Sequence, residues 1–498
     1  MSAPRSVARP ATRRTWFGLI VLQLPVLLVS MDFSVLYLAM PTISDALEPT
    51  ATQQLWILDI YGFMIAGLLI TMGNIGDRIG RRRILLAGAA VFGGASALAA
   101  FASDPSLLIA ARALMGIGGA TLMPASLSLI ANMFPLARER ARAIGVWTAA
   151  FAGGAAVGPV IGGALLHHFW WGVVFLINVP VLAVLFLAGP SLLPEFRAAR
   201  TEPFDVFGVV LSLAGILPVV YSVKTFAVHG ATATAVVTGL FGITMLAAFI
   251  RHERRAAAPL LVLSLFSNPS FSSSLAVAMV GMMAQGGLAY LTNVYLQSVL
   301  GYDVLTAALA GIPMAITVAV FSIYADRVTR LVGVRFALAG AVMLAGASAI
   351  ALVSLSTSTP LWVYLVITAV AGIGFGIQFS LVSDVVVGSA PPEKSGAASG
   401  VSETSFELGN ALGLALLGSL ATAVFLAGDG GRGFADSLGE TLKQSGRTGP
   451  VADAARSAFV DGLHVAALTG GGLLVVLGVV VVVVMRGSAE RREEPVLP

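Results

Sequence analysis

Runs of about 20 apolar residues recur along most of this chain, and they limit what it can fold into. A helix needs about 20 such residues to cross the apolar core of a bilayer. Charged residues make up only 11% of the chain, whereas soluble domains carry about 25%. The sequence therefore predicts an all-helical membrane protein with 14 spanning helices. The expected spans are 16–38, 54–73, 83–101, 106–130, 143–166, 170–189, 206–225, 233–250, 271–297, 304–323, 335–354, 361–381, 397–424 and 464–485.

The first apolar run follows the four arginines Arg5, Arg9, Arg13 and Arg14. A signal peptide begins in the same way, but no small-residue cleavage site follows here and the apolar run continues past Asp32. We therefore expect an uncleaved first spanning helix.

Most arginine and lysine residues fall in the loops on one side of these spans. Because basic loops stay in the cytoplasm, this side and both termini are expected to be cytoplasmic. An even number of spans fits this arrangement. The opposite side carries one long loop over 427–463, which includes a possible short amphipathic helix at 451–459. We expect a solvated connector there, or alternatively a lid over an outward-facing cavity.

Two loops in the chain resemble each other. Residues 73–83 join the second and third spans, and residues 324–335 join the tenth and eleventh. Both contain Asp-Arg followed by spaced basic residues and glycine. Loops placed alike in two halves are typical of transporters built from repeats. We therefore expect a six-helix bundle over 1–200, two inserted helices over 201–260 and a second bundle over 261–498.

The first of these loops is a candidate latch that holds one face of the protein shut. Gly73 and Gly80 let helix ends approach closely. Asp77 can pair with an arginine or lie near a helix N-terminus, and Arg78 and Arg81 supply the positive charges. The alternative is that the arginines only fix the topology. The matching residues of the second loop are Asp326 and Arg327.

Two carboxylates lie inside the thirteenth predicted span. Glu403 and Glu407 are four residues apart, so they stack on one helix face, and Asn410 continues that stripe. A charge at bilayer depth costs roughly 2.5–3.5 kcal/mol, so it needs a partner, a wet cavity or a function. Because loss of hydration disfavours a charged carboxylate, this pair and Asp32 are the best candidates for reversible protonation.

Three further charged residues lie within predicted spans, namely Asp32, Asp59 and Arg112. A buried arginine stays charged and needs a carboxylate, carbonyl or water partner. We expect Arg112 to face a central cavity, with snorkelling at one helix end as the alternative, and Asp32 could instead be its structural partner. Asp59 shares a helix face with Trp56 and Phe63, which suits a lipophilic cation. An interfacial position for Asp59 is the alternative.

Glycine recurs every four residues in the fifth span, at Gly154, Gly158 and Gly162, with Pro159 and Gly163 beside them. Such a small-residue face lets helices pack closely, and a proline bends the span.

Several classes of chemistry are excluded by what the sequence lacks. There is no cysteine, which excludes disulfides and thiol chemistry. After His252, Ala256 stands where a zinc helix needs its second histidine, and no lysine follows a glycine as in an ATP-binding loop. The net charge of +4 does not indicate a nucleic-acid partner. We therefore expect no metal and no cofactor, with an ion gradient as the energy source.

On these residues the chain resembles the major facilitator superfamily, in particular its fourteen-helix drug:proton antiporters of the QacA type. The resemblance covers nearly the full chain. Its pieces are residues 31–41, residues 55–61, the loop 73–83, the region of Arg112, the glycine face of the fifth span and residues 403–410.

This resemblance implies two six-helix bundles around a central cavity. It implies that Asp32, Glu403 and Glu407 take part in protonation and drug binding, and that Asp59 binds cations. It also implies proton handling by Arg112 and gating by Asp77 and Arg78. The family often has further acids near the thirteenth-span pair, whereas Ser402 precedes Glu403 here.

The expected function is proton-coupled export of lipophilic cations, such as dyes, quaternary ammonium compounds and antibiotics, across a bacterial cytoplasmic membrane. We expect a monomer whose partners are these drugs, protons and membrane lipids. The alternatives are a dedicated exporter of one natural-product antibiotic or lipid, and a proton-coupled nutrient importer. A membrane-embedded enzyme would need a convergent nucleophile, base or metal set, and none is evident in the sequence.

Overall fold

The structure is a computed structural model, and it describes residues 10–49, 51–197, 205–229, 232–256, 263–391, 395–435, 437–445 and 448–485. The first half contains α1 (Arg13–Leu47), α2 (Ala51–Ile79), α3 (Arg81–Ala100), α4 (Pro105–Met133), α5 (Ala137–His168), α6 (Val173–Leu176) and α7 (Asn178–Leu192). Helices α8 (Val206–His229) and α9 (Ala233–Glu253) follow. The second half contains η1 (Leu263–Ser267), α10 (Pro269–Val294), η2 (Tyr295–Val299), α11 (Val304–Leu309), α12 (Ile312–Ala351), η3 (Leu352–Ser354), α13 (Leu361–Ser389), α14 (Ser395–Ala427), α15 (Leu438–Gln444) and α16 (Pro450–Val484).

Thirteen helical segments among the described residues are long and apolar enough to cross a membrane. One of them, Thr306–Ser354, has 49 residues, about twice the length that one crossing needs. Its helix is interrupted at Gly333, where φ is 79° and ψ is 157°, a conformation that glycine adopts without steric cost. This segment covers the predicted spans 304–323 and 335–354. The fourteen predicted spans are therefore all accommodated.

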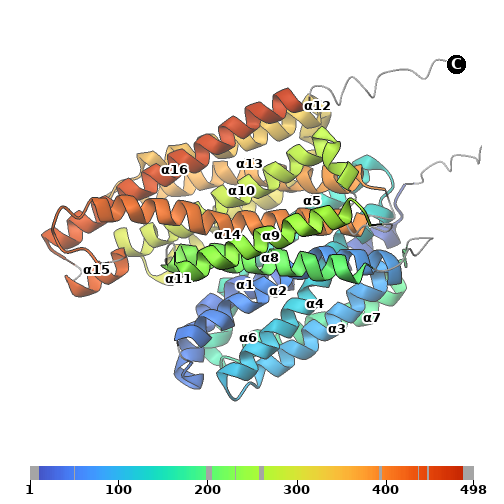
Figure 1. Ribbon diagram of the computed structural model, residues 1–498, viewed down its shortest axis with the longest axis horizontal. Coiled ribbons are helices and arrows are strands. Elements are labelled where there is room, and N and C mark those ends of the chain that lie inside the picture. The colour runs from blue at the N-terminus through green and yellow to red at the C-terminus, as the bar shows by residue number, and fades with distance from the viewer. Residues whose placement is uncertain are drawn as a thin grey trace, which may run out of the picture.

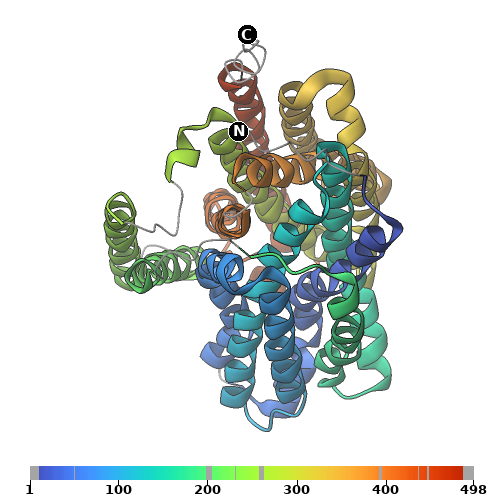
Figure 2. The same ribbon diagram turned by 90° about the vertical axis from the view of Figure 1, so that its right-hand side faces the viewer.

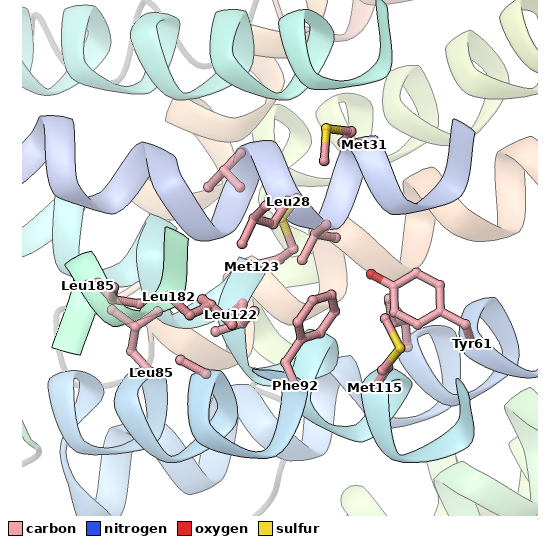
Figure 3. Close-up of a cluster of buried hydrophobic side chains, with 14 of the residues drawn as sticks. Leu28, Met31, Tyr61, Leu85, Phe92, Met115, Leu122, Met123, Leu182 and Leu185 are labelled. Atoms are coloured by element: carbon pink, nitrogen blue, oxygen red, sulfur yellow. The ribbon is translucent and has the colours of Figure 1, made fainter. Parts of the chain in front are cut away.

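The helices form two bundles that lie side by side (Figures 1 and 2). In the first, α1 packs against α5, and α4 packs against α2 and α3. In the second, α10 packs against α14, and α12 against α13 and α16. Figure 3 shows the core of the first bundle, where the rings of Tyr61 and Phe92 are 6.2 Å apart. The bundles meet along two seams, α2 with α14 and α5 with α12.

Both bundles use the same close helix contact. A Cβ at Gly158 of α5 would meet Met31 of α1, and a Cβ at Gly409 of α14 would meet the backbone of Met279 of α10. The missing side chains let each helix pair approach to backbone distance. This equivalence between α1–α5 and α10–α14 is what a repeated design produces.

Helices α8 and α9 pack against each other as a pair at one side of the bundles, and α8 also contacts α2 and α14 (Figure 2). Tyr221 of α8 stacks on Trp56 of α2 with ring centres 6.4 Å apart. The other helix of the pair, α9, exposes apolar side chains such as Val237 and Leu240. In a membrane protein such a face is directed toward lipid.

The last helix is longer than the sequence predicted. We expected a span over 464–485 after a connector over 427–463, whereas α16 begins at Pro450. Proline at the first helical position favours a helix start there. Small residues in these additional turns pack against the rest of the protein, and Ala452 and Ala455 are fully buried. The possible short helix at 451–459 is thus the first part of α16.

Candidate functional site

A buried ion pair joins α1 and α4. The Arg112 side chain donates a hydrogen bond to Asp32, and its Nε donates another to the carbonyl of Ile57 at 3.2 Å. The guanidinium also lies 4.5 Å from the centre of the Tyr61 ring of α2. Arg112 is fully buried, so it satisfies its charge inside the first bundle. Asp32 is therefore its structural partner, the alternative that the sequence left open.

The two glutamates of α14 lie where the bundles meet. Glu403 is 7% exposed, and its Oε1 atom has no hydrogen-bond partner among the described residues. Glu403 and Glu407 are close enough for their charges to interact. Glu407 in turn lies within electrostatic range of Tyr61. Tyr61 thus contacts Arg112 of the first bundle and also senses the charge of Glu407 of the second bundle.

Two other residues that the sequence predicted for the site, Asn410 and Asp59, are not placed with the buried acids. Asn410 of α14 is exposed and lies against Gly286 of α10. Asp59 belongs to α2, but its side chain lies outside the described residues.

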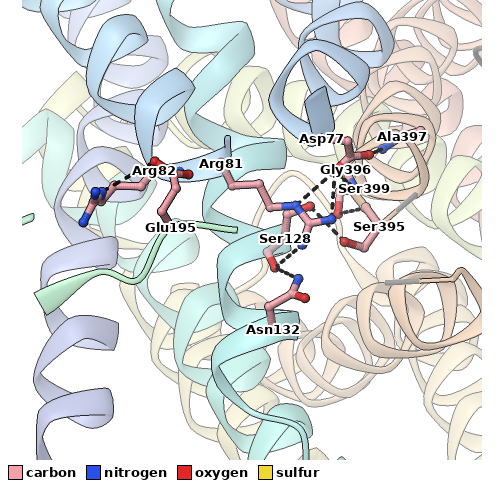
Figure 4. Close-up of polar contacts among 10 residues, drawn as sticks. All are labelled: Asp77, Arg81, Arg82, Ser128, Asn132, Glu195, Ser395, Gly396, Ala397 and Ser399. Carbon is pink, nitrogen blue, oxygen red and sulfur yellow. Dashed lines mark hydrogen bonds and ion pairs between the residues drawn. The ribbon is translucent and has the colours of Figure 1, made fainter. Parts of the chain in front are cut away.

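The loop between α2 and α3 contacts the opposite bundle (Figure 4). Asp77 accepts hydrogen bonds from Arg81 at 2.8 and 3.0 Å. It also accepts them from the backbone N–H groups of Gly396 at 3.2 Å and Ala397 at 3.3 Å, at the start of α14. A carboxylate at a helix N-terminus satisfies free N–H groups and complements the helix dipole. We call this set of contacts the latch.

Close backbone packing supports the latch. A Cβ at Gly73 would collide with the backbone of Gly396. Gly80 has a φ of 114° and links α2 to α3. Arg78 donates from Nε to Asn74 at 2.9 Å. The latch contacts described above come from Asp77, Arg81 and the backbone at Gly73, Gly396 and Ala397.

The second loop shows part of the same pattern. Arg330 pairs with Asp326 at 3.3 Å, one helix turn apart, as Arg81 does with Asp77. Arg327 lies over the ring of Tyr324 at 4.6 Å. Nearby, Ser322 of α12 donates to the carbonyl of Gly145 of α5 at 2.9 Å. The α5–α12 seam is therefore also closed at this end.

We call the end of the bundles that carries the latch the basic end, because its loops hold most arginines. A further contact crosses between the bundles here, from Arg140 Nε of α5 to Asp384 Oδ1 of α13 at 2.9 Å. The two bundles are thus in direct contact at the basic end along both seams.

The glycine face of α5 packs against α1. A Cβ at Gly154 would meet Ser30 and Leu27, and one at Gly162 would lie 2.9 Å from Val35. Gly163 instead lines a cavity, and the side chain of Pro159 lies outside the described residues. The face therefore has a packing role.

A cavity of about 1240 Å³ lies at the end opposite the basic end. It reaches residues late in α5, such as His167, in η2, such as Gln297, and early in α13, such as Tyr364. These positions are on the halves of their helices that are remote from the latch. A volume at or above the upper end of small-molecule sites can hold a drug-sized compound.

Sequence reasoning missed several of these residues. The partners of Asp77 and Arg140 are hundreds of positions away in the chain, and no local pattern marks them. Tyr61 gave a partial signal, because it follows Asp59 within the second-span motif. Gln285, which lines the cavity, was a polar residue in an apolar span and could have been selected on that ground.

Comparisons with known proteins agree with this architecture. The family model described as Major Facilitator Superfamily matches residues 26–414. The multidrug efflux pump LfrA of Mycolicibacterium smegmatis is 43% identical over 425 residues, 84% of this chain and 83% of that protein. The methyl viologen resistance protein SmvA of Salmonella typhimurium is 34% identical over 474 residues, 92% of this chain and 96% of that protein.

Two solved structures share the fold. The human organic anion transporter MFSD10 (TETRAN) has a TM-score of 0.63 and 16% identity, and the alignment covers 95% of this chain and 100% of that chain. A bacterial homologue of the human lysosomal transporter Spinster, inward-facing and unoccupied, has a TM-score of 0.59 and 18% identity, with 97% and 100% covered. Together with the family match over most of the chain, these findings show that this multi-pass membrane protein belongs to the major facilitator superfamily.

Proposed function

We propose that the protein is a proton-coupled antiporter that exports lipophilic cations, including dyes, quaternary ammonium compounds and antibiotics. The observation that carries this proposal is the 43% identity to a multidrug efflux pump over 84% of the chain. The name of a second relative, a methyl viologen resistance protein, refers to an organic dication. Both relatives match this chain over most of their length.

The basic end faces the cytoplasm in this proposal, because arginine-rich loops remain on the cytoplasmic side. Both termini then lie in the cytoplasm of a bacterial cell, and the cavity opens outward. The latch at Asp77 and the contact between Arg140 and Asp384 hold the cytoplasmic end shut. This arrangement is the state from which cargo leaves the protein.

Protons supply the energy, and no cofactor takes part. One oxygen of the Glu403 carboxyl group is buried without a hydrogen-bond partner among the described residues. Because a buried charge that is incompletely paired is disfavoured, we infer that Glu403 takes up a proton when α14 is packed as it is here. Asp32 can exchange its ion pair with Arg112 for a proton. Loss of the Asp32 charge would weaken its ion pair with Arg112, and loss of the Glu403 charge would remove its repulsion with Glu407; either change would bias the bundles toward another arrangement.

Ethidium efflux from energised cells tests this function. The wild-type protein should lower cellular ethidium, and an uncoupler that collapses the proton gradient should stop it. Glu403→Gln and Asp32→Asn, at matched expression, should reduce pumping by at least about tenfold, as removal of an essential proton site does. Efflux that continues after the gradient collapses would refute proton coupling.

A second candidate is a dedicated exporter of one natural product. Some relatives carry such names, among them the puromycin resistance protein of Streptomyces alboniger, 34% identical over 84% of this chain. Resistance of cells to a single antibiotic, without ethidium efflux, would distinguish this second function from multidrug export.

A further inference from the structure

The cavity and the acids lie on different helices. The residues that line the cavity come from α1, α5, α10, η2, α11, α12, η3 and α13. No described residue of α2, α4 or α14 is among them, although these helices carry Arg112, Glu403 and Glu407. Asp32 of α1 is not among the residues that line the cavity either. In this state the described acids Asp32, Glu403 and Glu407 are therefore not part of the cavity wall.

The cavity wall offers amides and aromatic rings instead. Gln285 lines the cavity, and its Oε1 atom, which is withdrawn from solvent and has no hydrogen-bond partner among the described residues, would reach a bound cation by a side-chain rotation. Gln297 donates to Asn293 Oδ1 at 2.9 Å, and both line the cavity with Phe375. A carbonyl oxygen and a ring face each attract a cation without carrying a charge. Such a wall suits flat or bulky organic cations of varied shape.

A series of ring contacts leads from the cavity to α14. Phe375 of the cavity wall stacks on Phe379, with centres 5.8 Å apart and planes 23° apart. Phe379 meets Phe406 of α14 edge to face at 5.5 Å. Phe406 lies in the turn between Glu403 and Glu407. Phe379 thus contacts both the cavity wall and the turn that carries the two glutamates.

We propose that cargo binds in the amide-lined cavity apart from the acids, and that Phe379 couples the two sites. This inference rests on the proposed function and specifies its mechanism. Protons and cargo then do not compete for one carboxylate. Instead, proton uptake on α14 changes the position of Phe406, and the ring contacts weaken the hold of the cavity on its cation. Coupling of this kind is reciprocal, so cargo binding also releases protons.

The charged groups around the acids come from several helices. Helix α10 carries none. Asp32 of α1 and Arg112 of α4 interact electrostatically with Tyr61 of α2, as Glu407 does. Helix α13 carries Asp384, which is paired with Arg140. The other charged or titratable positions on helices in contact with α14 are Asp59, Asp77, Arg78, Lys224, His229, Asp453, Arg456, Asp461 and His464.

Equilibrium binding of ethidium to the purified full-length protein in nanodiscs, at acidic and at alkaline pH, tests the proposal. Wild-type affinity should be higher at alkaline pH. Gln285→Ala should weaken binding about tenfold at both pH values, as loss of one hydrogen-bonding group to a cation does. Phe379→Ala should leave the alkaline affinity within about threefold and remove most of the pH dependence. Phe379→Leu keeps the apolar bulk without the ring and should give the same result if Phe379→Ala folds poorly.

A double-mutant cycle separates this mechanism from direct competition. Glu403→Gln should weaken binding in the wild type but should have no effect in the Phe379→Leu background. Phe241→Ala is the matched control, because this ring is 50% exposed on α9 and should change nothing. An equal effect of Glu403→Gln in both backgrounds would overturn the coupling role of Phe379. Unchanged affinity in Gln285→Ala would overturn the cavity assignment. If the wild type bound no ethidium at either pH, the proposed function itself would fail.

Discussion

Arg112 and Asp32 form an ion pair that is almost completely withdrawn from solvent, with 1% and 4% of their side chains exposed. Removing one partner of such a pair leaves an uncompensated buried charge and costs about 3–5 kcal/mol. The two removals are not equivalent, however. An aspartate can take up a proton and become neutral, whereas an arginine cannot lose its charge.

We therefore expect Asp32→Asn to lower the thermal unfolding temperature more than Arg112→Gln does. Stability of the Arg112→Gln protein should also increase as the pH falls, because protonation removes the lone charge of Asp32. Thermal unfolding in detergent across a pH series measures both effects. Equal destabilisation by the two changes, without pH dependence, would show that the pair is not held as an isolated buried charge pair.

The latch makes a prediction about access from the basic end. Asp77→Ala removes the acceptor of two backbone N–H groups of α14, and hydrogen bonds to a charged group contribute about 1.5–3 kcal/mol. The basic end should then open more often. Because the chain has no cysteine, one cysteine at buried Ser399 can report this opening, and its alkylation should become at least about tenfold faster.

Asp453→Ala is the matched control for that experiment. It removes an exposed acid that pairs with Arg456 within α16, away from the latch, and alkylation at position 399 should stay unchanged. Equal alkylation rates in Asp77→Ala and the wild type would mean that the latch does not hold the basic end.

The contact between Arg140 and Asp384 predicts a charge-swap rescue. Arg140→Asp places two like charges at a junction between the bundles where each side chain is about 20% exposed, so transport should fall. Arg140→Asp combined with Asp384→Arg restores opposite charges and should recover a substantial part of it. Ethidium efflux at matched expression is the readout. A double variant no better than the single one would indicate that the contact has no role in the cycle.

Neighbouring glycines of α5 should differ in their tolerance of a methyl group. A Cβ at Gly154 would meet the Leu27 carbonyl at 2.7 Å, whereas one at Gly153 would meet nothing within 4 Å. Gly154→Ala should cost about 1–3 kcal/mol through overpacking, and Gly153→Ala should be neutral or slightly stabilising. Thermal unfolding compares the two directly, and equal values would show that α1 and α5 do not pack as described.

The sequence was sufficient for much of the fold because each span is a long local signal. Apolar length predicted the membrane helices, and the two similar loops indicated the repeat. Local spacing also placed Glu403 and Glu407 on one helix face. The predicted start of the last span, at residue 464, was wrong, because α16 begins at Pro450. Small residues near its start, such as Ala452, are buried by tertiary packing, and the polar residues around them in the sequence do not indicate this burial.

The site was less accessible to sequence reasoning. A helical period shows which residues share a face, but not which helix covers that face. We expected Arg112 to face a central cavity, whereas in this state it is enclosed with Asp32 and Tyr61. The cavity itself is assembled from helices of both halves, and its lining, Gln285 included, depends on which ends of the bundles are closed.

Proton movement that accompanies cation transport in liposomes of purified protein is the most direct test of the central claim. With a pH-sensitive dye enclosed, addition of ethidium should drive proton exit as ethidium enters, and Glu403→Gln should abolish both fluxes. We predict that an imposed pH gradient alone, without any membrane potential, is enough to concentrate ethidium. Ethidium movement at the same rate with and without the gradient would contradict proton-coupled export.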